Sequence, residues 1–135
     1  MSACTESIHV DGSPEQVGAF LADVHNLPRW TGFFRSVGEP AGDRWEVATA
    51  MGTTIRTRVE RPTRDRFAIS SLVGEREERA ELVVEPEDGG ARVSFTVKVL
   101  PALAEHNGGD GLSVQRDRMR AELRRLRGAV TPPGT

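Results

Sequence analysis

The spacing of hydrophobic and polar residues changes several times along the chain. Residues 4–10 alternate, with Ile8 and Val10 on one face, which predicts a short strand. Between residues 13 and 24 apolar residues recur every three or four positions, which predicts a helix. Alternation returns from residue 34, and helical spacing returns near residue 112. The order predicted is therefore a strand, helices, a run of strands and a final helix.

The first helix has a distinct start signal. Ser13 can cap the helix, Pro14 fits its first position, and Gln16 completes a reciprocal capping box with Ser13. We expect this helix to end at about Val24. A second, short helix that contains Trp30 follows directly.

Six strands are predicted after the second helix. They cover residues 34–38, 43–50, 53–61, 65–72, 76–86 and 90–99. The breaks between the longer strands are short and rich in turn formers such as Asp88 and Gly89, so consecutive strands must pair as antiparallel neighbours. With the strand at residues 4–10, they make seven strands.

The final helix, at about residues 112–129, carries one narrow apolar stripe. Its members are Leu112, Met119, Leu123, Leu126 and Val130. This stripe is the largest cover available for the apolar face of an antiparallel sheet. Because the sheet twists, it would curl around the helix and leave room for a cavity that suits a small apolar ligand.

Composition narrows the function classes. A chain of 135 residues predicts one domain at residues 1–130, followed by a frayed tail at 131–135. The net charge of −2 argues against a dedicated nucleic-acid binder. The final helix nevertheless carries six arginines against two acids, so an interaction module for nucleic acid or an acidic partner is an alternative to a solvated basic face.

Candidate metal, disulfide and membrane features are sparse. One cysteine excludes an internal disulfide and a cysteine-based metal cluster, and the three histidines lack the spacing of metal ligands. No apolar run reaches the ~18 residues of a membrane span, and the N-terminus lacks the pattern of a signal peptide. We expect a cytoplasmic protein without metal or cofactor, as a monomer or homodimer.

Three segments carry a resemblance to a known family. Residues 6–17 and 21–30, with a Ser-Pro-Glu helix start and a later Pro-Arg-Trp, resemble the START-like helix-grip superfamily, in particular its polyketide cyclase/dehydratase and lipid-transfer branch. Residues 85–93 resemble the penultimate hairpin of that family. The resemblance covers nearly the whole chain. It implies an α+β helix-grip fold in which a curved, seven-stranded antiparallel sheet surrounds a long C-terminal helix.

The resemblance also implies a function. We expect a hydrophobic small molecule to bind between the sheet and the C-terminal helix, with cyclisation or dehydration of a polyketide-like secondary-metabolite intermediate as the reaction. The alternative is a non-enzymatic lipid or metabolite carrier, or a self-resistance binding protein. The chain has no tyrosine, and the family's catalytic pattern relies on tyrosine or histidine, so this alternative stays open.

Three residues are candidates for catalysis. Cyclases of this superfamily place an arginine on the strand at residues 53–61 facing the cavity, which implies Arg58, with Arg56 as a second, ligand-binding arginine. The alternative places this charged strand face in solvent. Glu78 would be a buried base if its strand face points inward, and a solvated strand-end residue otherwise. His106 could pass protons at the cavity mouth or lie in a solvated loop.

The remaining candidates are expected to contact the ligand. They are Trp30, Phe34, Trp45, Thr49, Phe67, Phe95, Arg116, Met119 and Leu123. Trp30 and Phe34 come first because the second helix forms one rim of the family's pocket. The aromatic residues also suit an ordinary core. Arg116 lies roughly 45° from the centre of the apolar stripe, so its head could reach the cavity mouth or extend into solvent.

Overall fold

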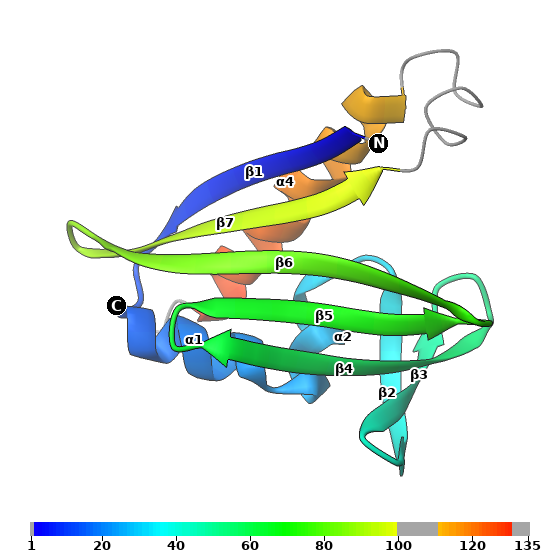
Figure 1. The fold of residues 1–135 in the computed structure, drawn as a ribbon. Coiled ribbons are helices and arrows are strands. Elements are labelled where there is room, and N and C mark those ends of the chain that lie inside the picture. The colour runs from blue at the N-terminus through cyan, green and yellow to red at the C-terminus, as the bar shows by residue number, and fades with distance from the viewer. Residues whose placement is uncertain (1, 100–110, 131–135) are drawn as a thin grey trace.

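The computed structural model describes residues 2–99 and 111–130, in the element order predicted from the sequence (Figure 1). The strands are β1 (Ser2–Val10), β2 (Phe34–Ala41), β3 (Arg44–Thr49), β4 (Thr54–Thr63), β5 (Arg66–Val73), β6 (Arg76–Glu87) and β7 (Gly90–Val99). The helices are α1 (Pro14–Ala22), the 3-10 turn η1 (Val24–Asn26), α2 (Leu27–Trp30) and α4 (Gly111–Val130).

The seven strands form one antiparallel sheet with the order β1-β7-β6-β5-β4-β3-β2. Short turns join each strand from β2 to β7 to its neighbour, as short connections require. β1, the first strand in the sequence, pairs with β7, the last one, so that Glu6 lies opposite Phe95. The sheet curves, and the helices lie on its far side in Figure 1. The predicted α+β helix-grip fold is therefore confirmed.

The predicted capping box starts α1. The Ser13 hydroxyl accepts a hydrogen bond from the Gln16 backbone at 3.1 Å, and the Gln16 side chain accepts one from the Ser13 backbone at 3.0 Å. α1 ends at Ala22, two residues earlier than expected. The cause is Asp23, whose side chain accepts a hydrogen bond from the His25 backbone and starts η1.

One apolar core joins all three helices to the concave face of the sheet. Trp30 of α2 is buried and meets the edge of Phe95 of β7 at a ring distance of 5.5 Å. From α4, the core receives Met119, Leu123 and Leu126, which are fully or almost fully buried. These three belong to the predicted apolar stripe, so the sheet holds the helix as the sequence indicates.

Ion pairs hold the same helix from its sides. Arg116 and Arg120 of α4 each lie 3.1 Å from the Glu6 carboxylate on β1. Arg125 donates a hydrogen bond to the Thr31 carbonyl at 3.0 Å, just after α2. Part of the basic surface predicted on this helix therefore serves packing within the domain.

Candidate ligand cavity

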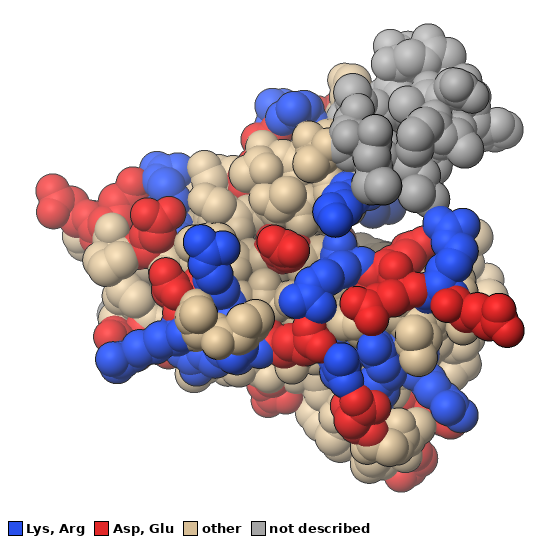
Figure 2. All heavy atoms as spheres, in the orientation of Figure 1, with Lys and Arg blue, Asp and Glu red and all other residues tan. Residues whose placement is uncertain are grey.

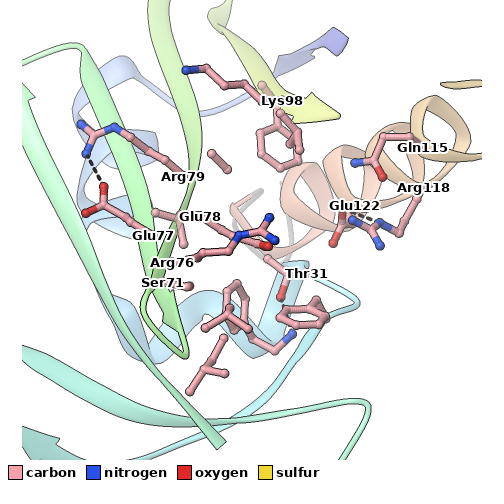
Figure 3. A pocket seen from close by; sticks show the side chains of 18 residues that line it. Thr31, Ser71, Arg76, Glu77, Glu78, Arg79, Lys98, Gln115, Arg118 and Glu122 are labelled. Atoms are coloured by element: carbon pink, nitrogen blue, oxygen red, sulfur yellow. Dashed lines mark hydrogen bonds and ion pairs between the residues drawn. The ribbon is translucent and has the colours of Figure 1, made fainter. Parts of the chain in front are cut away.

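A cavity of about 500 Å³ lies between α4, the loop that follows α2, and strands β4 to β7 (Figure 3). Its volume is within the range of small-molecule sites. Most of its floor is apolar, supplied by Phe33, Phe34, Ile55, Ile69, Ala80, Phe95 and Val97. These side chains come from the concave face of the sheet and from the α2–β2 loop. Such a floor favours the ring or chain of an apolar ligand over water.

The wall formed by α4 is polar. It presents Gln115, Arg118 and Glu122 to the cavity, and Figure 3 shows the three on one side of the helix. Their spacing of three and four residues places them on one helical face. Relative to the face that carries Met119 and Leu126, this polar face is rotated by roughly 60°. One helix thus presents an anchoring face to the core and a polar face to the cavity.

Glu122 is the buried charge of this wall. Only 6 % of the residue is exposed, and its Oε2 accepts a hydrogen bond from the Gly32 backbone at 2.8 Å. Its Oε1 lies 4.0 Å from Nε of Arg118. Burial raises the pKa of the carboxyl above its ordinary value, while the Gly32 bond and the nearby arginines, Arg118 and Arg125, oppose the rise. A carboxyl in this position suits proton transfer.

Gln115 places a hydrogen-bond donor in the cavity wall. Its side-chain nitrogen Nε2 is buried and has no hydrogen-bond partner among the described residues. Buried polar groups are normally paired, so an unpaired amide in a cavity wall suits a ligand oxygen. The two hydroxyls that line the cavity, those of Thr31 and Ser71, are already bonded to Leu27 and Thr57, both at 2.8 Å.

The cavity mouth carries exposed charges of both signs. Arg76 and Glu78 come from β6, and Lys98 comes from β7. Glu77 and Arg79 alternate with the first two toward the opposite face of the sheet, where they form an ion pair at 3.7 Å. Because the mouth is charged and the floor is apolar, we expect a ligand to bind with its apolar part at the floor.

The structure corrects the expected placement of the β4 arginines. Ile55 lines the cavity, whereas Arg56 and Arg58 point to the opposite, convex face. There Arg58 pairs with Asp43 and, at 2.6 Å, with Glu60. Figure 2 views this face and shows acidic and basic side chains interspersed on it. The expectation that Arg58 faces the cavity is wrong, because an ion-pair network on the solvated face holds it there.

The other two candidates for catalysis have different outcomes. Glu78 lies on the concave side and borders the cavity, as the inward reading of its strand requires. It is exposed at the mouth, so it is not the buried carboxylate that this reading implied. His106 lies outside the described residues.

Some of the predicted ligand contacts line the cavity and others do not. Phe34 and Phe95 line the cavity. Seven others do not border the cavity, because their side chains are engaged elsewhere in the domain. Four of them are buried in the core: Trp30, Phe67, Met119 and Leu123. Thr49 bonds to Thr53, Trp45 meets the ring of His25 at 4.6 Å, and Arg116 pairs with Glu6. Arg56 is exposed on the convex face.

Sequence reasoning missed Glu122 and Gln115, although a signal for both exists. Glu122 follows Met119 by three residues and precedes Leu126 by four, which places it beside the apolar stripe. Gln115 precedes Met119 by four residues and lies on the same side. Arg116 flanks the stripe on the other side, at the β1 edge, where it pairs with Glu6. The sequence does not indicate which of the two flanks of the stripe borders the cavity.

Metal-ligand clusters and membrane-spanning helices are both missing from the described part of the chain. Within residues 2–99 and 111–130, no three side chains of His, Cys, Asp or Glu gather as a metal site. Over the same ranges, no helix is long and apolar enough to cross a membrane.

Comparison with known proteins gives a family match and many structural matches. The sequence matches the family described as polyketide cyclase / dehydrase and lipid transport over residues 1–131. A search among curated proteins gives no significant match.

Three of the solved structures with a similar fold are the following. Protein CV1439 from Chromobacterium violaceum is 16% identical, with a TM-score of 0.71 over 98% of this chain and 99% of that chain. A START superfamily protein from Mycobacterium smegmatis is 15% identical, with a TM-score of 0.65 over 95% and 96%. The di-domain ARO/CYC StfQ from the steffimycin biosynthetic pathway is 13% identical, with a TM-score of 0.60 over 93% of this chain and 49% of its own. At these identities the likeness concerns the fold.

Proposed function

Because the chain belongs to the polyketide cyclase / dehydrase and lipid transport family, we propose that it binds a hydrophobic small molecule in the cavity and catalyses its cyclisation or dehydration. The observation that carries the proposal is the cavity of about 500 Å³, whose floor is apolar and whose α4 wall is polar. An apolar floor favours a ring or chain, while a polar wall fixes its orientation.

Orientation is a large part of what such a reaction needs. Cyclisation joins two carbons of one flexible chain, and a cavity that folds the chain brings these carbons together before reaction. Dehydration needs a group that moves a proton, and the polar wall contains such a group in a carboxyl protected from water.

Binding is tested by filling the cavity. Ala80 lines the floor, and Ala80→Phe places an aromatic ring in the space meant for the ligand. We expect an apolar fluorescent dye to bind the wild type and to bind this variant at least about tenfold more weakly, because contact area at the floor is lost. Ala121→Phe is the matched control, since Ala121 is exposed on α4. Equal affinity of all three proteins for the dye would refute the cavity as its binding site.

Catalysis is tested with a linear poly-β-ketone thioester supplied to the wild type. A product that has lost one water, as seen by mass spectrometry, is the expected result. The carrier alternative retains one specific support: Arg58, the arginine expected to act in catalysis, points away from the cavity. Intact ligand that is retained in native mass spectrometry and stays unchanged would favour a carrier.

A further inference from the structure

The polar wall of α4 contains three side chains with different chemistry. Gln115 has a buried amide nitrogen with no partner in residues 2–99 and 111–130, Arg118 has a charged guanidinium, and Glu122 has a carboxyl buried at the cavity. All three border the cavity from one helical face (Figure 3). Gln115 and Glu122 are seven positions apart, which is about 10 Å along a helix. It can therefore contact one edge of a ligand at more than one place.

The two oxygens of Glu122 have different surroundings. Oε2 is held by the Gly32 backbone at 2.8 Å, which fixes the carboxyl group in place. Oε1 has no hydrogen bond from the described residues, and the nearest cation is Nε of Arg118 at 4.0 Å. A reacting carbon at Oε1 would thus have a positive charge close to it. This combination of a fixed base and a neighbouring cation suits removal of a proton next to a carbonyl group.

On the basis of the proposed function, we propose that Glu122 is the acid–base residue that acts on an enolisable ketone, with the ketone oxygen bound by Arg118. Gln115 binds a second oxygen at the far end of the same molecule. The substrate class is a flat or folded apolar ketone with oxygen functions along one edge. That edge lies along α4, and the carbon skeleton lies on the floor formed by residues such as Phe34 and Phe95.

The reaction step balances without any further reagent. Oε1 of Glu122 takes a proton from the carbon beside the carbonyl, and the electron pair of that C–H bond forms the carbon–carbon double bond of an enolate. The carbonyl π pair moves to oxygen, where the Arg118 cation stabilises it. If the carbon on the far side of the deprotonated carbon carries a hydroxyl, the enolate oxygen reforms the carbonyl, the enolate C=C pair forms a new double bond to that carbon, and its C–O bond breaks. The departing hydroxyl takes the proton from Glu122 and leaves as water, which restores the carboxylate.

Hydrogen exchange isolates the first half of this step. Two probes are used in heavy water, 2-tetralone and 6-hydroxy-2-tetralone, and the latter has its second oxygen at the opposite end of the rings. We expect the wild type to bind both probes and to speed the exchange of their hydrogens beside the carbonyl. Glu122→Gln should bind them and exchange about 10²- to 10⁴-fold more slowly. Glu81→Gln is the matched control, because Glu81 is an exposed β6 carboxylate that does not border the cavity.

The second oxygen is tested by Gln115→Leu. This variant should bind 6-hydroxy-2-tetralone about fivefold to tenfold more weakly and should bind 2-tetralone as the wild type does. Equal losses for the two probes would overturn the role of Gln115.

The remaining outcomes separate the role of Glu122 from ligand binding as such. If Glu122→Gln exchanges the ketone hydrogens at the wild-type rate, the role of Glu122 is overturned. The same holds if Glu78→Gln loses the exchange while Glu122→Gln keeps it. A wild type that binds both ketones without speeding exchange overturns the acid–base role and leaves ligand binding intact. A wild type that binds neither ketone nor the apolar dye refutes the proposed function itself.

Discussion

Replacing Glu122 by glutamine should stabilise the protein at neutral pH, although it removes a charge from an ion pair. Burial raises the pKa of this carboxyl, so the native state keeps the proton to a higher pH than the unfolded chain does. The native state therefore binds more protons above the unfolded pKa, and stability falls as pH rises through that window. Glutamine has no such titration, so the variant should not show this part of the fall.

The size of the effect follows from the contacts. Each unit by which the pKa is raised costs about 1.4 kcal/mol once the group is ionised. The amide oxygen of the substituted glutamine can still accept from Gly32, so that hydrogen bond is kept. The attraction to Arg118 is already contained in the net rise of the pKa, and it is worth under about 1 kcal/mol because this partner is 55 % exposed and lies 4.0 Å away. We expect a net gain of about 1 kcal/mol at pH 7, and none at pH 4.

Glu122→Leu separates charge from hydrogen bonding. Leucine also removes the charge, but it leaves the Gly32 backbone N–H without its acceptor, at a cost of about 1–3 kcal/mol. The expected order of stability at pH 7 is therefore glutamine above leucine, by about 1 kcal/mol or more.

Urea unfolding followed by tryptophan fluorescence between pH 4 and pH 8 measures all three proteins. Glu81→Gln serves as the control, because an exposed carboxylate should change stability little. The reasoning is refuted if Glu122→Gln is less stable than the wild type at pH 7, or if the difference between them does not change with pH.

Three further predictions concern the scaffold. Gly90→Ala should destabilise the protein by about 3 kcal/mol or more, because the new Cβ would lie 2.0 Å from the Val10 carbonyl oxygen. Gly128→Ala should stabilise it by about 0.5–1 kcal/mol, because this position of α4 faces open space. Urea unfolding of both variants measures this, and equal effects would contradict it. Hydrogen bonds from Arg120 and Arg116 lower the pKa of Glu6 against the opposing effect of burial. The ionised Glu6 therefore stabilises the native state above its unfolded pKa, and this stabilisation is lost as pH falls through its native pKa. Thermal melts at neutral and acid pH should therefore show Glu6→Gln converging on the wild type in acid, and a constant gap would argue against it. Cys4 is fully buried, so a thiol reagent should label it only after denaturant is added, and rapid labelling of the native protein would disagree.

The fold could be predicted because its signals are local. Alternation identified the strands, a reciprocal cap at Ser13 identified the start of α1, and the apolar stripe identified the helix that the sheet holds. Short turns then left one way to pair consecutive strands. The resemblance to a family named the same architecture.

The cavity residues were harder to predict because their placement depends on the third dimension. For β4, alternation already placed Ile55 and Thr57 on the apolar face and Arg58 on the other, but the family's habit of using an arginine on this strand outweighed that evidence. For α4, the sequence shows the apolar stripe but not which side of it meets empty space. That side depends on where the helix crosses the sheet, so Glu122 was visible as a residue and not as a cavity group.

The division of α4 into two neighbouring faces has a consequence for divergence. Met119, Leu123 and Leu126 hold the helix in the core, while Gln115, Arg118 and Glu122 line the cavity. Substitutions on the cavity face of α4 can therefore change the polar groups of the cavity without disturbing the core packing that stabilises the fold. The same fold indeed recurs in solved structures that are only 13–16% identical to this chain.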